Sequence, residues 1–386
     1  MIKVLTVLGT RPEAIKLAPI IKRLERDPRF ASITCVTSQH REMLDQVLEV
    51  FDVVPHHDLA VMTPAQSLAD LTAKVVQKMS DIVAAERPAI VLVQGDTTTT
   101  FAASLAAFYH KIPVGHVEAG LRTSDKYQPF PEEINRRLTT VLADYHYAPT
   151  AISRQNLLAE GIDSQRILVT GNTGIDALLI ALDRVRQGGA IDDPFPQGVP
   201  DGDGKRLILV TAHRRESFGA AFEAICDALR LIAERNADVT IVYPVHLNPQ
   251  VRRPVFERLA GCPRIHLLEP LSYLSFVQMM DRAHLILTDS GGIQEEAPAL
   301  GKPVLVMRNT TERPEAVEAG SARLVGTSTE TIASAVQHLL DDVKVYEQMS
   351  QARNPFGDGH ASERIACHIL GTFGDEGRQS SHHEEN

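Results

Sequence analysis

The sequence predicts an α/β protein made of two doubly wound domains that face each other across a cleft. Its 386 residues exceed the roughly 250 to 300 at which a single hydrophobic core stops growing. Short β-branched runs alternate with longer helical patterns along the whole chain. These runs lack polar alternation, which is typical of parallel strands covered by helices on both faces.

The predicted strands form two series. The first contains residues 4–8, 33–37, 90–93, 112–117 and 167–170, and the second contains residues 207–211, 239–243, 265–268, 285–288 and 304–307. We expect an N-terminal domain at 1–171, because the first series ends before Gly171 and residues 175–178 open a helix. A C-terminal domain at 172–360 follows, with a Gly/Pro/Asp-rich loop at 187–204 before its first strand. Residues 371–386 are polar, and we expect a disordered tail there.

Composition excludes several classes of function. The formal net charge of -10 argues against a nucleic-acid backbone as a partner. The chain has no run of about 18 apolar residues that would span a membrane, and its first apolar run is too short for a signal peptide. The four cysteines lack C-x-x-C spacing, so we expect reduced thiols and a cytoplasmic protein with no metal site.

A glycine turn between a strand and a helix is the most informative segment: Asp289-Ser290-Gly291-Gly292-Ile293-Gln294-Glu295-Glu296. Backbone N–H groups at such a turn form a seat for phosphate. No lysine follows as in an ATP-binding P-loop. The two glutamates would repel a bare phosphate but accept hydrogen bonds from ribose hydroxyls, so a nucleotide-linked ligand fits. The alternative is a capping Ser290 with ordinary acidic residues in the first turn.

Several polar residues lie just past the carboxyl end of a predicted strand, where open parallel sheets bind ligands. They are Arg11, Asp96, Glu118, His213 and Ser290. Each has an alternative reading: Arg11 as an ordinary first-turn residue, Asp96 as a helix N-cap, and Glu118 as a solvated loop carboxylate. The acidic pair Glu132 and Glu133 would be ordinary first-turn residues, whereas the cationic run from His213 to Arg215 favours an anion site.

Seven segments in this order closely resemble the non-hydrolysing UDP-N-acetylglucosamine 2-epimerases, over residues 1–359. They are Gly9-Thr10-Arg11-Pro12-Glu13, Gln39-His40-Arg41-Glu42-Met43, Gly95-Asp96-Thr97, His116-Val117-Glu118-Ala119-Gly120-Leu121-Arg122, Pro131-Glu132-Glu133-Ile134-Asn135-Arg136, His213-Arg214-Arg215-Glu216 and the glycine turn. The resemblance implies the glycosyltransferase-B architecture of two Rossmann-like domains around a cleft. It also implies a homodimer and a C-terminal helix, here residues 361–370, that crosses back to the first domain.

The resemblance implies reversible inversion of C2 in UDP-N-acetylglucosamine, through anti elimination of UDP to a 2-acetamidoglucal and re-addition, for cell-surface polysaccharide precursors. Carboxylates suit the proton transfers, and positive groups would stabilise the leaving diphosphate. The matching catalytic positions are Asp96, Glu118, Glu132 and His213. The matching substrate-binding positions are Arg11, Lys16, Phe276, Ser290, Gly291, Gly292, Glu296 and Arg313. Positions that resemble an effector pocket are Gln39, Gln66, Arg214 and His246.

No nicotinamide or other cofactor is expected, because neither glycine turn completes G-x-G-x-x-G. Asp201-Gly202-Asp203 resembles a D-x-D metal signature but lies in the loop at 187–204 rather than at a strand end. Leu271 departs from the family, whose members often carry a polar contact to the base near this position. Four alternatives stay open: a UDP-sugar transferase of the same architecture, a hydrolysing epimerase, a UDP-sugar-sensing binding module, and a 2-epimerase of a 2,3-diacetamido uronic UDP-sugar.

Overall fold

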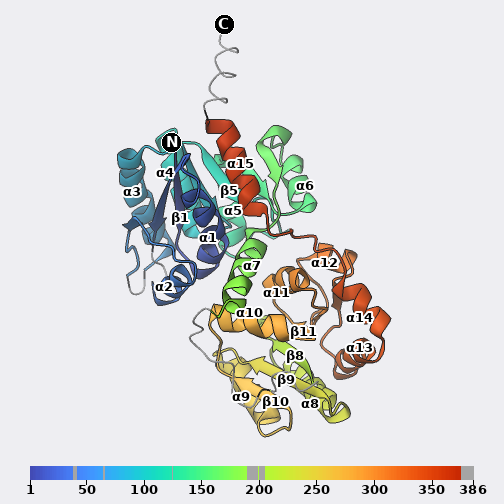
Figure 1. Ribbon diagram of the computed structural model, residues 1–386. Helices are drawn as coiled ribbons and strands as arrows, with labels where there is room; N and C mark the ends of the chain where they lie inside the picture. The colour runs from blue at the N-terminus through green and yellow to red at the C-terminus, as the bar shows by residue number, and fades with distance from the viewer. Residues whose placement is uncertain (38–40, 64–65, 124, 189–198, 200–204, 375–386) are drawn as a thin grey trace. The chain divides into compact units, whose positions relative to one another are not determined.

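The computed structural model describes residues 1–37, 41–63, 66–123, 125–188, 199 and 205–374. The chain divides into two compact units (Figure 1). Unit 1 comprises Met1–Ile180 together with the segment from Phe356, and unit 2 comprises Ala181–Pro355. Each unit is a parallel sheet with alternating helices, so the predicted α/β class with two domains is confirmed.

The sheet of unit 1 has the order β3-β2-β1-β4-β5-β6-β7, with every neighbouring pair parallel. Its strands are β1 (Ile2–Leu8), β2 (Phe30–Val36), β3 (His57–Asp58), β4 (Ile90–Gln94), β5 (Val114–Val117), β6 (Tyr145–Ala148) and β7 (Ile167–Val169). Its helices are α1 (Arg11–Glu25), α2 (Arg41–Val50), α3 (Leu68–Glu86), α4 (Thr98–Tyr109), α5 (Glu132–Leu142), α6 (Ala151–Ala159), α7 (Thr173–Arg186, which runs into unit 2) and α15 (Ala361–Phe373). Helices α3, α4 and α5 pack in one layer, and α2, α1 and α15 pack in another (Figure 1).

The sheet of unit 2 has the order β10-β9-β8-β11-β12-β13 and is also parallel throughout. Its strands are β8 (Arg206–Thr211), β9 (Val239–Pro244), β10 (Ile265–Leu268), β11 (Leu285–Thr288), β12 (Val304–Val306) and β13 (Ala322–Leu324). Its helices are α8 (Ala220–Arg235), α9 (Pro249–Leu259), α10 (Tyr273–Arg282), α11 (Gly291–Glu296), α12 (Pro314–Glu318), α13 (Thr329–Asp341) and α14 (Val343–Ser350).

The strands are apolar because both faces of each sheet are covered. Leu5, Val7, Val91 and Val93 are buried together under α3 and α4 in unit 1. In unit 2 the equivalent core gathers strands β8, β9 and β11 under α8 and α13. The central strands β4, β5 and β11 bury every side chain, so they need no polar alternation.

The division between the units falls inside α7 rather than at the 171/172 boundary expected from the sequence. The first half of α7 is tied to the C-terminal segment of unit 1. Asp176 accepts hydrogen bonds from the backbone N–H groups of Ala361 (3.2 Å) and Ser362 (2.8 Å). Asn172 N–H donates to the carbonyl of Phe356 at 2.6 Å. These contacts fix where α15 begins.

Helix α15 packs against α1 in unit 1 (Figure 1). His368 of α15 lies edge-on to the ring of Tyr145, with centroids 5.2 Å apart. The helix continues to Phe373, which corrects the expectation that the tail begins at residue 371. The rest of that expected tail, from residue 375, lies outside the described residues, as do Asp201 and Asp203.

Candidate active site

Two carboxylates follow neighbouring strands of unit 1. Asp96 comes after β4 and Glu118 comes directly after β5, and these strands pair with Gln94 opposite Val117. Parallel strands end at one edge of the sheet, so the two acids are neighbours. Asp96 does not cap α4, because that cap is Thr97, whose side chain accepts from Thr100 N–H.

Glu118 is held by polar groups from three segments. Its Oε1 forms an ion pair with Lys16 Nζ and accepts from Asn172 Nδ2 at 3.2 Å, while its Oε2 accepts from Gln94 Nε2. The side chain is only 8% exposed, which excludes the solvated-loop reading. Glu118 also has a positive φ of 64°, a conformation that costs a non-glycine residue about 1–2 kcal/mol. Such strain is typical of functional positions.

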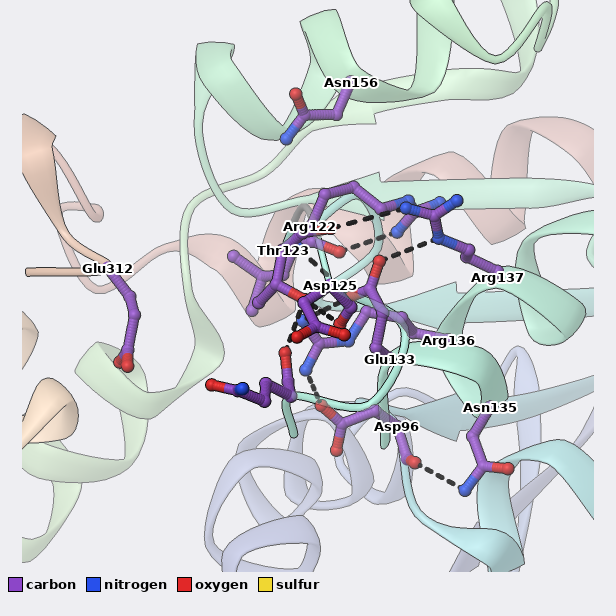
Figure 2. Close-up of polar contacts among 12 residues, drawn as sticks. Asp96, Arg122, Thr123, Asp125, Glu133, Asn135, Arg136, Arg137, Asn156 and Glu312 are labelled. Atoms are coloured by element: carbon purple, nitrogen blue, oxygen red, sulfur yellow. Dashed lines mark hydrogen bonds and ion pairs between the residues drawn. The ribbon is translucent and has the colours of Figure 1, made fainter. Parts of the chain in front are cut away.

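Asp96 is held from helix α5 (Figure 2). Its Oδ2 forms an ion pair with Arg136 Nη2, and its backbone carbonyl accepts from Asn135 Nδ2 at 3.0 Å. Burial raises the pKa of Asp96 above its usual range. The Arg136 guanidinium opposes this rise in pKa, and the neighbouring Glu118 carboxylate adds to it. Asp96 is therefore a carboxylate whose protonation depends on its neighbours.

A buried histidine contacts the backbone of the turn that carries Asp96. His116 Nε2 lies 2.7 Å from the carbonyl oxygen of Gly95, and burial lowers the pKa of His116 to about 4. The imidazole is therefore neutral near pH 7, and its Nε2–H donates to Gly95. This residue belongs to one of the seven motifs, but nothing in its spacing indicated the role.

Helices α1 and α5 of unit 1 carry three further candidate residues: Arg11, Lys16 and Glu132. Arg11 is the first residue of α1 and is half-buried, and Lys16 lies further along that helix. Glu132 is the first residue of α5 and is also half-buried. The structure brings Asp96, Glu118 and Lys16 together and places Glu132 on the helix whose Asn135 and Arg136 contact Asp96.

Glu13 is a site-shaping residue that sequence reasoning did not single out. This buried carboxylate accepts from Gly9 N–H (3.0 Å) and Thr10 N–H (2.7 Å), and from the hydroxyls of Thr97 (2.7 Å) and Thr100 (3.0 Å). It thereby joins the turn after β1 to the turn after β4. The Thr10-x-x-Glu13 capping box is the sequence signal for it.

In unit 2, His213 and Asp289 follow the neighbouring strands β8 and β11, in which Thr211 pairs with Thr288. The fully buried Asp289 accepts through Oδ2 from the N–H groups of His213 and Arg214, each at 2.7 Å. Its Oδ1 lies 3.5 Å from His213 Nδ1. Burial lowers the pKa of His213, the Asp289 carboxylate opposes this, and the His213 ring stacks on His246 with centroids 5.4 Å apart.

The glycine turn leads directly into α11, as predicted. Ser290 occupies the N-cap position without a side-chain cap hydrogen bond, so its hydroxyl is not used as a cap. A Cβ on Gly291 would lie 3.7 Å from both Arg214 Nη2 and Glu312 Oε2, which places these charged groups beside the turn. A Cβ on Gly292 would have no atom within 4 Å, so the space beside this residue is open.

The two glutamates of the turn differ in their surroundings. Glu295 is buried and forms an ion pair with Arg313, whereas a hydrogen bond from either glutamate to a ribose stays a prediction. Its carboxylate is already engaged with a cation. Glu296 is half-buried at the end of α11, and Phe276 on α10 is half-buried as well, so their roles stay predictions.

The residues predicted for an effector pocket are placed as follows. Gln66 lies in unit 1 and accepts through Oε1 from Thr63 N–H at 3.1 Å. Arg214 and His246 lie in unit 2, where Arg214 Nη2 is 3.3 Å from Glu312 Oε2. Gln39 lies outside the described residues. An effector role for these four stays a prediction.

The part of the chain that the structure describes contains no group of three or more His, Cys, Asp or Glu side chains arranged to hold a metal ion. No helix within those residues combines the length and the hydropathy that crossing a membrane requires.

Comparison with known proteins identifies the family. The sequence model of the UDP-N-acetylglucosamine 2-epimerase family matches residues 22–370. The chain belongs to this family. The UDP-N-acetylglucosamine 2-epimerase of Salmonella typhimurium is 58% identical over 364 residues, which cover 94% of this chain and 97% of the relative. That of Escherichia coli K12 is 58% identical over 365 residues, with the same coverage.

Solved structures of UDP-N-acetylglucosamine 2-epimerases share the fold. The enzyme of Neisseria meningitidis, bound to UDP-GlcNAc, superposes with a TM-score of 0.85 at 50% identity, over 96% of this chain and 100% of that one. The enzyme of Methanocaldococcus jannaschii, in complex with UDP-GlcNAc and UDP, has a TM-score of 0.75 at 35% identity, over 97% and 100% of the two chains. The resemblance seen in the motifs is confirmed, and with it the glycosyltransferase-B type of fold.

Proposed function

We propose that the protein interconverts UDP-N-acetylglucosamine and UDP-N-acetylmannosamine by inverting C2. The observation that carries the proposal is the carboxylate pair at the ends of β4 and β5 with a lysine against it, in a chain 58% identical to a UDP-N-acetylglucosamine 2-epimerase. A module that only binds a UDP-sugar needs the glycine turn but has no use for a strained, buried Glu118.

The chemical difficulty is that the hydrogen at C2 is poorly acidic, since no carbonyl adjoins it. Anti elimination avoids this: a base removes the C2 proton while the C1–O bond breaks and its electron pair leaves with UDP. The product is 2-acetamidoglucal. In the return step a phosphate oxygen of UDP attacks C1. An acid then delivers a proton to the face of C2 opposite the one from which the first proton was removed. Atoms and charge balance, and no net oxidation occurs.

Asp96, Glu118 and Glu132 supply the proton transfers in this proposal. A base and an acid must work on opposite faces of C2, so at least two carboxylates with different protonation are needed. Glu118 is ion-paired with Lys16, which favours its ionised form. Asp96 has a raised pKa because of burial, so its proton affinity differs from that of an exposed aspartate. Arg11 and Lys16 add positive charge in the same unit.

The nucleotide is assigned to unit 2. Negative charge grows on the diphosphate as C1–O breaks, so groups placed there act most strongly in the transition state. The amides of Ser290, Gly291 and Gly292 and the side chains of His213 and Arg313 are the candidates. Glu296 would hold the ribose hydroxyls and Phe276 would pack near uracil, while half-buried Leu271 offers no polar group to the base.

The deciding experiment is incubation with UDP-N-acetylglucosamine in deuterium oxide, followed by NMR. The proposal expects both C2 epimers of the UDP-sugar, each with deuterium at C2. A transferase would need an acceptor and would leave C2 protonated. A hydrolysing epimerase would release free N-acetylmannosamine and UDP. Turnover only of a 2,3-diacetamido uronic UDP-sugar would change the substrate and keep the chemistry.

Variants test the residue roles. Loss of a positioned acid or base costs about 10² to 10⁴ in rate, so Asp96→Asn, Glu118→Gln and Glu132→Gln should each lower kcat by that range. Glu25→Gln is the matched control, because Glu25 pairs with Lys22 at the far end of α1. Near-normal turnover in all three site variants would contradict the assignment of these carboxylates.

We also propose that the protein is a homodimer. Helix α5 exposes an apolar row, Ile134, Leu138 and Val141, on the face opposite its buried Asn135, Arg136 and Thr139. Pairing with the same row of a second copy would remove these apolar side chains from water. Light scattering should give twice the chain mass of 42.3 kDa, and Val141→Asp should give the monomer. A wild-type monomer would contradict the dimer.

The proposed cellular setting is the cytoplasm, in supply of precursors for cell-surface polysaccharide. All four cysteines are free, two of them buried, which is typical of a reducing compartment. Deletion of the gene should deplete UDP-N-acetylmannosamine in cell extracts, and fractionation should place the protein with soluble markers. An unchanged nucleotide-sugar pool would contradict the precursor role.

A further inference from the structure

Helix α5 holds Asp96 at two points. Asn135 Nδ2 donates to the backbone carbonyl of Asp96 at 3.0 Å, and Arg136 Nη2 forms an ion pair with its Oδ2 (Figure 2). The two donors are consecutive residues of one helix. Helix α5 therefore holds both the backbone and the carboxylate of Asp96. The Oδ1 atom of Asp96 takes no part in these two contacts.

Arg136 is itself held by a carboxylate that takes no direct part in the site. Glu133 is 0% exposed, and its oxygens accept from Arg137 Nε at 2.7 Å and from Thr123 N–H at 3.1 Å. Its Oε2 lies 3.4 Å from Arg136 Nη1 (Figure 2). A buried carboxylate with three donors is costly to disturb, since loss of a partner leaves an uncompensated buried charge.

This arrangement makes Arg136 a bridge between two acids. One terminal nitrogen faces Glu133 and the other faces Asp96, and a planar guanidinium can satisfy both only in one orientation. The side chain is 10% exposed, so water competes weakly for either contact. The guanidinium plane therefore fixes the rotamer of Asp96.

The charges that face Asp96 come from three elements. They are Arg136 from α5, Glu118 after β5 and Lys16 from α1. Burial raises the pKa of Asp96, Glu118 raises it further, and Arg136 and Lys16 lower it. Lys16 is engaged with Glu118, so Arg136 is the cation in direct contact with Asp96.

We propose that Arg136 is a positioning residue: it fixes the orientation of the Asp96 carboxylate and places a positive charge against it, while Glu133 anchors Arg136. The proposal rests on the proposed function only in that Asp96 acts on the substrate. The contact between Arg136 and Asp96, and its effect on the charge of Asp96, exist in the free protein.

The first test follows the carboxyl of Asp96 directly, without substrate. The protein is labelled with carboxyl-¹³C aspartate, and the Asp96 resonance is identified by its loss in Asp96→Asn. An opposite charge within contact distance lowers a carboxyl pKa by about 1–3 units. In Arg136→Gln the titration midpoint should therefore rise by about one unit or more.

Two variants make the test specific. Arg136→Lys keeps the charge, so its Asp96 midpoint should stay close to that of the wild type. Arg29→Gln is the matched control, because Arg29 lies in the same unit and forms an ion pair with Asp27, but is 58% exposed and contacts neither Glu133 nor Asp96. Its Asp96 midpoint should not move.

The second test is kinetic and separates orientation from charge. Lysine lacks the two-headed fork of arginine, so Arg136→Lys should lower kcat by about tenfold to a hundredfold through misplacement of Asp96, with KM little changed. In Arg136→Gln the limb of the kcat/KM profile that reports Asp96 should also move to higher pH. Arg29→Gln should keep both kcat and the profile.

The outcomes are distinguishable. An Asp96 resonance that titrates at the wild-type pH in Arg136→Gln overturns the charge part of the proposal, and full kcat in Arg136→Lys overturns the orientation part. A wild-type protein that converts no UDP-N-acetylglucosamine overturns the proposed function, whereas the NMR titration still decides the contact. If Arg136→Gln fails to fold, as thermal melting would show, Arg136→Lys decides the orientation part. The double variant Arg136→Gln, Glu133→Gln then decides the charge part, because it removes both members of the buried ion pair together. Its Asp96 midpoint should rise, and an unmoved midpoint would overturn the charge part.

Discussion

Replacement of Asp289 by Asn tests how the loop after β8 is held. In the structure one carboxylate oxygen accepts the N–H groups of both His213 and Arg214 at 2.7 Å, and the other faces the His213 ring at 3.5 Å. The side chain is fully buried. Asparagine has nearly the same shape, so the substitution removes the charge and one acceptor with little change in packing.

The cost follows from the two short backbone contacts. Hydrogen bonds to a charged acceptor contribute about 1.5–3 kcal/mol each, against about 0.5–1.5 for neutral pairs. Two such bonds weakened by about 1 kcal/mol each give about 2 kcal/mol, which lowers the melting temperature of a unit of this size by roughly 4–8 °C. Asp289→Ala leaves both N–H groups unpaired, so we expect roughly 2–6 kcal/mol.

Activity should fall as well, because the substitution removes the negative charge that lies 3.5 Å from Nδ1 of His213. We expect kcat of Asp289→Asn to drop by at least about tenfold, as with other histidines that lose a carboxylate partner. Asp238→Asn is the matched control: Asp238 pairs with Arg206 in the same unit but is 54% exposed, and such pairs contribute only about 0–1 kcal/mol. Melting curves and steady-state rates that match those of Asp238→Asn would refute the reasoning.

Three further outcomes are expected. Burial without a polar partner among the described residues lowers the pKa of His146 to about 3, below its unfolded value of 6.5, so the folded state binds fewer protons. The free energy of unfolding should therefore fall by up to about 1.4 kcal/mol per pH unit as the pH drops below 6.5. Urea titrations of His146→Phe should show a shallower dependence of this free energy on pH. A Cβ at Gly120 (φ +91°) would meet the Ser153 carbonyl oxygen at 2.2 Å, so Gly120→Ala should lower the melting temperature well beyond Gly161→Ala, which has φ +83° and open space; equal shifts would disprove the clash. Burial raises the pKa of the Cys35 and Cys226 thiols to about 12, so maleimide should label the exposed Cys367 first in the native protein and reach those two only on unfolding, which peptide mapping would check.

The hydrophobic pattern was enough to find most of the sheet. Every run proposed as a strand from its β-branched residues overlaps an observed strand, from β1 (Ile2–Leu8) to β12 (Val304–Val306). The strands that were missed are β3, β6 and β13. Strand β6 reads Tyr-His-Tyr-Ala, without the β-branched aliphatic run used as the signal, and β3 and β13 have only two and three residues. Their pairing with a neighbouring strand, rather than their own composition, makes them strands.

For the candidate site, too, some residues could be found from the sequence and others could not. Position at a strand end made Asp96, Glu118 and His213 candidates, because a parallel sheet presents its ligand-binding edge at the carboxyl ends of its strands. Their proposed catalytic roles came from the family resemblance. The partners of these residues were not predictable. Arg136 lies 40 residues from Asp96, and Asp289 lies 76 residues from His213.

The sequence by itself therefore determined the α/β class, the positions of most strands along the chain and the turns that carry the chemistry, since periodicity and turn residues act over a few neighbours in the chain. Only the tertiary structure decided which charge meets which. It paired Glu295 with Arg313, buried Glu133 beneath Arg136, and placed Lys16 against Glu118. The free energy of a buried charge depends on groups brought within a few ångströms by packing, and their separation along the chain carries no record of that distance.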